Sequence, residues 1–121
     1  MTRTTTFGYE LIFDLHNCQD KESLRSKRRL QDFVDRLCKL LKMKKYGKTL
    51  IPHFGHDSEI TSGYSLLQFI ETSSITGHFS EGMDAVYLNV FSCKPYNVAK
   101  AKKFVKDFFR PKRMKVRYLV R

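Results

Sequence analysis

The sequence has no run of about 18 apolar residues, the shortest length typical of a membrane-spanning helix. Its opening residues, Met-Thr-Arg-Thr-Thr-Thr, lack the apolar stretch of a secretory signal peptide. Cysteine is scarce, and Cys18, Cys38 and Cys93 are an odd number without the spacing of metal ligands. We therefore expect a cytoplasmic protein with reduced thiols, no membrane contact and no bound metal.

Lysine and arginine are missing from residues 49–93, although the whole chain has a net charge of +11. Eleven basic residues lie in 21–48 and another eleven in 94–121, mostly on two predicted helices and their flanks. The central stretch instead carries five acidic residues, Asp57, Glu59, Glu71, Glu81 and Asp84. This distribution argues against a nucleic-acid-binding protein, and the acidic centre suits a small cationic partner.

The spacing of apolar residues predicts strands and two helices in a chain long enough for a single domain. One helix is expected over 21–43, with Asp20 as its cap and Gly47 as its stop, and another over 97–109, with Asn97 as its cap. Strands are expected over 7–16, 50–54, 64–71, 73–79, 85–92 and 114–120, with a loop over 55–63. Two helices can cover only one sheet face, so we predict an α+β two-layer sandwich with a mostly antiparallel sheet.

Side chains that could act in catalysis lie on the central predicted strands. Ser73 and His78 lie five residues apart on one predicted strand, Cys93 ends the next, and Ser65 lies on the preceding one. We expect them to meet at one site, where a serine, a base and a thiol could act together. A structural reading stays open for each: polar alternation on a half-exposed strand, a small buried cysteine, and an ordinary strand-end histidine.

The stretch from Tyr64 to Cys93 resembles the self-processing, pyruvoyl-dependent S-adenosylmethionine decarboxylases of bacterial and archaeal type. In that family a serine, a processing serine, a histidine and a cysteine recur at the spacings found here for Ser65, Ser73, His78 and Cys93. A weaker resemblance covers residues 8–20 and 91–95. The resemblance implies that domain 1–121 cuts itself between Thr72 and Ser73 into 1–72 and 73–121, and that Ser73 becomes a covalent pyruvoyl cofactor.

The resemblance also implies a role for each site residue. Ser65 and His78 would assist the cleavage, and Cys93 would act as proton donor after the pyruvoyl group has held the substrate amine as a Schiff base. The substrate would be S-adenosylmethionine, decarboxylated for polyamine synthesis by a homodimer. Glu81 and Glu71 are candidates for contacts to the ribose or the sulfonium, and three aromatic residues are candidates for stacking on adenine: Phe54, Tyr64 and Phe79.

Two departures from the family pattern leave alternatives open. Thr72 stands where the family usually has glutamate, with Glu71 one place earlier, and His78 is followed by Phe-Ser-Glu instead of a Trp-Pro-Glu type run. A relative with a rebuilt pocket could decarboxylate ornithine or arginine. An uncleaved homologue could bind S-adenosylmethionine or a protein without turnover. The pair His53 and His56 has the form H-x-x-H, which is a weak metal motif without cysteines at ligand spacing.

Overall fold

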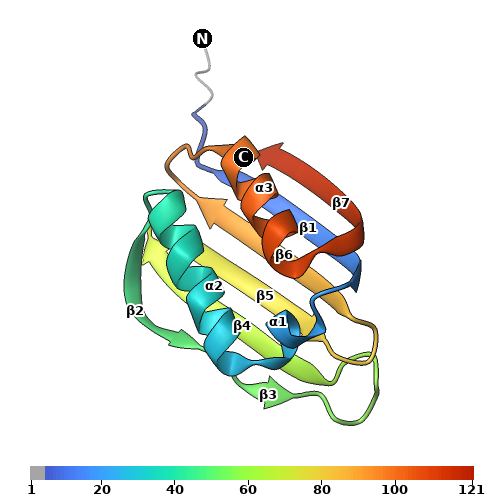
Figure 1. Ribbon diagram of the computed structural model, residues 1–121. Helices are drawn as coiled ribbons and strands as arrows, with labels where there is room; N and C mark the ends of the chain where they lie inside the picture. Colours follow the sequence, from blue (N-terminus) through green and yellow to red (C-terminus); the bar gives the residue numbers. More distant parts are fainter. Residues whose placement is uncertain (1–4) are drawn as a thin grey trace.

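The computed structural model describes residues 5–121. The N-terminal stretch was expected not to be a signal peptide, and its first four residues lie outside the described part of the chain. The elements in chain order are β1 (Tyr9–Cys18), α1 (Lys21–Arg25), α2 (Lys27–Leu40), β2 (Lys44–Leu50), β3 (His53–Phe54), β4 (Gly63–Glu71), β5 (Ser73–Ser80), β6 (Ala85–Ser92), α3 (Val98–Phe109) and β7 (Pro111–Val120). The strands form one antiparallel sheet in the order β2-β4-β5-β6-β1-β7, and β3 pairs with β4. All three helices lie on the same side of this sheet (Figure 1), which confirms the predicted two-layer α+β class.

The core lies between the sheet and the helices. Alternation along β1 and β6 turns Leu11, Phe13, Leu88 and Val90 toward the helices, where each is fully buried. Phe33 of α2 is also fully buried, and its ring contacts the rings of three α3 phenylalanines, Phe104, Phe108 and Phe109. Burying one such side chain contributes about 1.5–3 kcal/mol, so this layer holds the helices firmly against the sheet.

The prediction of one helix over 21–43 was wrong. Ser26 is extended (φ −116°, ψ 116°) and its hydroxyl accepts a hydrogen bond from Arg29 N–H, so it ends α1 and caps α2. The helix then ends at Leu40, because Lys42 adopts a left-handed turn (φ 57°). Gly47, the expected stop, lies inside β2 instead.

The expected strand over 50–54 was displaced for the same reason. Because the helix ends early, residues 44–50 are free to pair with β4, and Leu50 ends that strand. Only His53 and Phe54 form the next short strand. The caps Asp20 and Asn97 and the other predicted strands were confirmed, within one to three residues at most ends.

The second face of the sheet is uncovered by any helix of the described chain (Figure 1). Large apolar residues are exposed along β2 and β4, including Tyr46 (66%), Leu50 (55%) and Phe69 (52%). None of the helices in residues 5–121 is long and apolar enough to span a membrane. A contiguous apolar face of this kind usually contacts a ligand or a partner.

Candidate active site

Ser73 and Cys93 lie together at one end of the β5–β6 pair. Ser73 is the first residue of β5 and pairs with Ser92, so Cys93 follows directly on the neighbouring strand. The Ser73 Oγ and Cys93 Sγ atoms are 3.5 Å apart. The backbone N–H of Cys93 donates to the Thr72 carbonyl at 3.1 Å. The peptide link expected to break is thus held between a hydroxyl and an N–H donor.

The backbone of Ser73 is unusual. Its φ is 133°, an angle that L residues other than glycine rarely adopt. Such strained conformations cost about 1–3 kcal/mol and cluster at reactive sites. The pairing on both sides of Ser73, with Ile70 of β4 and Ser92 of β6, holds the residue in this conformation.

The environment of Cys93 favours its thiolate. Hydrogen bonds from the Ser73 side chain, and then from the Thr72 side chain, lower the pKa of the Cys93 thiol below its ordinary value. Burial has the opposite effect on Cys18 and Cys38, raising the pKa to about 12 and about 11. Cys93 is therefore the cysteine suited to exchange protons, and the other two are buried in the core.

A cavity of about 670 Å³ opens beside Ser73 on the uncovered sheet face. Aromatic rings dominate its lining, with Phe7, Tyr46, Phe69 and Phe91. Glu71 also lines the cavity, and its carboxylate lies 3.5 Å from Lys44 Nζ. Of these aromatic residues none was a candidate from the sequence. The available signal was strand alternation, which places Phe91 on the same face as Cys93 and Phe69 on the same face as Ser65.

Ser65 and His78 form a second pair on the same sheet. They are partners across β4 and β5, and the Ser65 hydroxyl lies 2.9 Å from His78 Nδ1. A cavity of about 430 Å³ beside them is lined by Phe54 and Tyr64, along with other residues. Phe79 also borders it but is only 2% exposed and packs against the core ring of Phe109.

The two pairs do not meet within one chain. Five residues of extended strand separate Ser73 from His78, which is roughly 16 Å at about 3.3 Å per residue. The expectation of one site formed by a single chain is not met, because a strand cannot fold back over so short a length. Side chains of Ser74, Thr76 and His78 instead follow the uncovered face from one pair to the other, alternating with buried Ile75 and Phe79.

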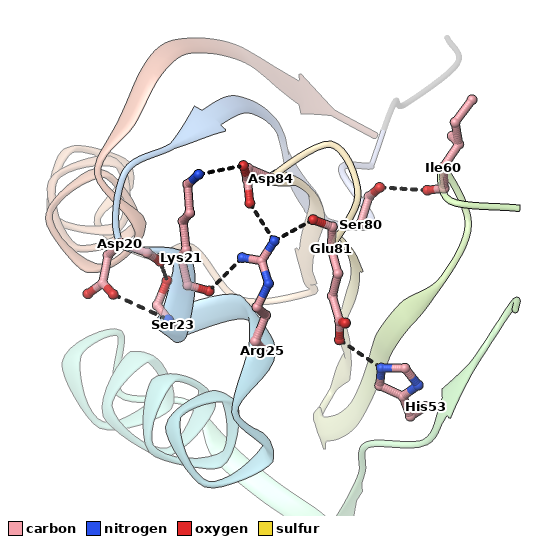
Figure 2. A network of polar contacts seen from close by, with 9 residues as sticks. All are labelled: Asp20, Lys21, Ser23, Arg25, His53, Ile60, Ser80, Glu81 and Asp84. Atoms are coloured by element: carbon pink, nitrogen blue, oxygen red, sulfur yellow. Dashed lines mark hydrogen bonds and ion pairs between the residues drawn. The ribbon is translucent and has the colours of Figure 1, made fainter.

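Glu81 lies beyond the His78 end of β5, in a network of polar contacts (Figure 2). Its carboxylate is 2.7 Å from His53 Nε2, and its carbonyl accepts a hydrogen bond from the Arg25 guanidinium. Arg25 also pairs with Asp84 at 2.7 Å. The sequence suggested Glu81 but not its histidine partner, because β3 and the β5–β6 turn are distant along the chain. His56 lies 3.4 Å from His53, yet within residues 5–121 no group of three potential ligand side chains could hold a metal.

The fold and these pairs together define a class: α+β two-layer proteins with a hydroxyl–thiol pair and a hydroxyl–imidazole pair on one open sheet face. Residues 9–121 match the model of the family described as S-adenosylmethionine decarboxylase. The chain therefore belongs to the S-adenosylmethionine decarboxylase family.

The fold is also similar to that of a solved protein. The crystal structure of the adenosylmethionine decarboxylase from Aquifex aeolicus VF5 superposes with a TM-score of 0.79 at 16% sequence identity. The alignment covers 98% of this chain and 92% of the other. At this identity the likeness shows the fold alone. A comparison with curated proteins gave no match.

Proposed function

We propose that the chain is a self-processing, pyruvoyl-dependent S-adenosylmethionine decarboxylase. The observation that carries the proposal is the geometry at Ser73: the Cys93 thiol faces its hydroxyl while the Cys93 N–H holds the Thr72 carbonyl. Membership of the family supports the substrate. As in the family, the product would serve polyamine synthesis, and the expected compartment is the cytoplasm.

The self-cleavage starts from the chain's own atoms. The Ser73 hydroxyl loses its proton to the Cys93 thiolate and attacks the Thr72 carbonyl carbon. The Cys93 N–H stabilises the charge on the carbonyl oxygen. The C–N bond then breaks as its nitrogen takes the proton back from the Cys93 thiol, which leaves an ester and a free amine. Removal of the Ser73 α-proton then breaks the Cβ–Oγ bond, which releases a chain ending in the Thr72 carboxylate. Water then hydrolyses the bond to the nitrogen of residue 73, which is released as ammonia and leaves a pyruvoyl group at position 73.

The residues around Ser73 fit such a group. The Cys93 N–H donates to the Thr72 carbonyl, the Ser73 backbone is strained, and an aromatic cavity opens beside it. A pyruvoyl group would supply an electron sink for the loss of carbon dioxide. The protein's own part is to bind the substrate in the aromatic cavity, to exclude water and to return a proton from the Cys93 thiol.

We propose that a second copy of the chain supplies His78 and Ser65 to the Ser73 site. Both pairs lie on the uncovered apolar face, and two such faces can stack as a two-fold sandwich. A two-fold axis that crosses β5 near Thr76 carries the His78 end of one copy over the Ser73 end of the other. His78 would then reach the Ser73 α-proton as a base. The second copy would also bring three candidate substrate contacts, Glu81, Phe54 and Tyr64. Glu71 lines the cavity from the chain that supplies Ser73.

Intact mass under denaturing conditions tests the proposal. Wild-type protein should give pieces of about 8 and 6 kDa, in proportion to 72 and 49 residues of a 14.3 kDa chain. Ser73→Ala should stay whole, and Ser74→Ala is the matched control that should still be cut. The cleaved protein should release carbon dioxide from S-adenosylmethionine faster than from ornithine or arginine.

Each measurement has its own contrary outcome. An unbroken wild-type chain that nevertheless binds S-adenosylmethionine would replace the enzyme by the non-catalytic binder. A reversed ranking of substrates would keep the mechanism and change the substrate to a free amino acid.

A further inference from the structure

Tyr46 presents its ring to the Ser73 cavity from an edge strand of the sheet. It lies on β2, opposite Phe69 of β4, and 66% of its surface is exposed. It borders the same cavity as Ser73 and Ser74. Because the Tyr46 ring is so exposed, it gains little free energy from burial in this chain. Contact with another molecule explains its position better.

The charges around the cavity favour recognition by aromatic rings. Among the described residues that line it, Glu71 is the only carboxylate, and Lys44 already pairs with it at 3.5 Å. A cationic ligand therefore finds no unpaired negative side chain in this lining. The faces of aromatic rings attract cations, and in the lining that this chain supplies they are the groups left to do so. Tyr46 has the most exposed ring of those on the strands that border the cavity.

A buried glutamine holds the backbone that carries Tyr46. Gln68 of β4 is fully buried, and its amide nitrogen donates to the carbonyls of Tyr46 (3.4 Å), Gly47 (3.2 Å) and Phe69 (2.8 Å). Its amide oxygen accepts a hydrogen bond from the Thr49 hydroxyl. Directly after Tyr46, the pairing of β2 with β4 shifts register.

The register shift explains why this glutamine is needed. An irregularity in a ladder leaves backbone carbonyls without their usual partners, and the fully buried amide of Gln68 needs acceptors, because an unpaired buried donor is costly. Gly47 takes a φ of 75° at this point, which turns the strand. Gln68 satisfies the freed carbonyls, so it fixes where Tyr46 leaves the strand.

We infer that Tyr46 binds the cationic part of the substrate with its ring face, and that Gln68 is a positioning residue that acts through Tyr46. This rests on the proposed function, because the substrate is taken from it.

Kinetics of cleaved Tyr46→Ala test the first half. KM should rise by about 3- to 30-fold, the range of a cation–ring contact. The kcat and the extent of self-cleavage should stay as in the wild type, since the ring touches neither the scissile bond nor Cys93. Tyr46→Phe should restore KM. Val120→Ala, a control on β7 with 59% exposure outside the cavity lining, should leave KM unchanged.

A double-mutant cycle tests the second half. Gln68→Leu should raise KM by a similar factor, and adding Tyr46→Ala to it should raise KM little further, because both changes remove the same contact. A merely structural role for Gln68 would give effects that multiply. If Gln68→Leu does not fold by circular dichroism, Thr49→Val replaces it in the cycle, because it removes the hydrogen bond to the glutamine oxygen.

The contrary outcomes are distinct from failure of the proposed function. An unchanged KM in Tyr46→Ala overturns the inference, and so does a lower association state in sedimentation, which would assign Tyr46 to a contact between chains. If wild-type protein neither cuts itself nor releases carbon dioxide, calorimetry of S-adenosylmethionine binding replaces kinetics. Equal affinity of wild type and Tyr46→Ala, or no binding by either, then overturns the inference as well.

Discussion

Cys93 offers two groups to the Ser73 site, and they act in different ways. Its backbone N–H donates to the Thr72 carbonyl, and its thiol faces the Ser73 hydroxyl. The substitution Cys93→Ala keeps the backbone N–H and removes the thiol. Cleavage and turnover can therefore be separated at this one residue.

Cys93→Ala should still be cut between Thr72 and Ser73, though more slowly, but should lose most of its turnover. The retained N–H still stabilises the carbonyl oxygen, whereas the proton donor for the substrate carbon is gone. General acid–base groups contribute about 10²–10⁴-fold, so a loss of that order is expected in sustained carbon dioxide release. Progress curves and electrophoresis of the same samples measure the two steps together.

The control is Cys38→Ala, because this thiol is buried in the core and the structure does not place it at the Ser73 site. It should leave both cleavage and kcat unchanged. Full sustained activity in Cys93→Ala would remove the thiol from the reaction and leave only its backbone in the site.

At the scale of elements, Asp20 joins the first two helices. Its carboxylate accepts from Ser23 N–H at 3.3 Å as the cap of α1, and it accepts two hydrogen bonds from Arg29 of α2, at 2.9 and 3.1 Å. The hydrogen bonds from Arg29 are the main reason why the pKa of Asp20 lies below its ordinary value of 3.8. Its charged form is therefore favoured in the folded protein.

Asp20→Asn separates the ion pair from the cap, because asparagine caps a helix as well as aspartate does. At pH 7 we expect a loss of about 0.5–1 kcal/mol in the free energy of unfolding, as for a partly exposed ion pair. A lowered pKa stabilises the fold above pH 3.8, and this contribution disappears as the pH falls through the lowered value. Urea unfolding at a series of pH values from 7 to 3 should show that the difference in unfolding free energy between Asp20→Asn and wild type shrinks.

Asp32→Asn is the matched control for the ion pair. Its pair with Arg36 is longer, at 3.4 Å, and both side chains are more than half exposed. Its effect should be close to zero at every pH. A gap for Asp20→Asn that stays constant down to pH 3 would show that the charge of Asp20 contributes nothing.

At the scale of the whole molecule, the separation of the two pairs predicts complementation between inactive variants. In the proposed mechanism, Ser73→Ala has no residue to process, and His78→Ala lacks the base at every site. In a mixed dimer, however, the Ser73 of one chain can face the His78 of the other. Co-expression, or mixing after unfolding and refolding, should therefore yield cleaved His78→Ala chains, detected by a mass tag on that variant.

Each variant alone sets the background for this experiment. A mixture that is cut no more than His78→Ala alone would place His78 outside the Ser73 site. Sedimentation at the mass of one 14.3 kDa chain would exclude the two-fold sandwich itself.

Local patterns in the sequence predicted most of the fold. Alternation along β1 and β6 set which side chains face the core, and Asp20 and Asn97 marked the helix starts, because caps and alternation act over a few residues. The helix over 21–43 failed because helical spacing continues through Ser26, whose hydroxyl instead caps a new helix. The strand over residues 44–50 was missed because its partner, β4, lies about twenty residues later in the chain.

By itself, the sequence indicated the candidate groups through the spacing of Ser65, Ser73, His78 and Cys93, and it showed a central stretch free of lysine and arginine. Only the tertiary structure decided which of them meet. Pairing of β5 with β6 brings Cys93 to Ser73, but the rigid rise of a strand keeps His78 at the other end. Tyr46 borders the cavity beside Ser73, and Gln68 of β4 donates to its carbonyl across the strand pair, which no local pattern can specify.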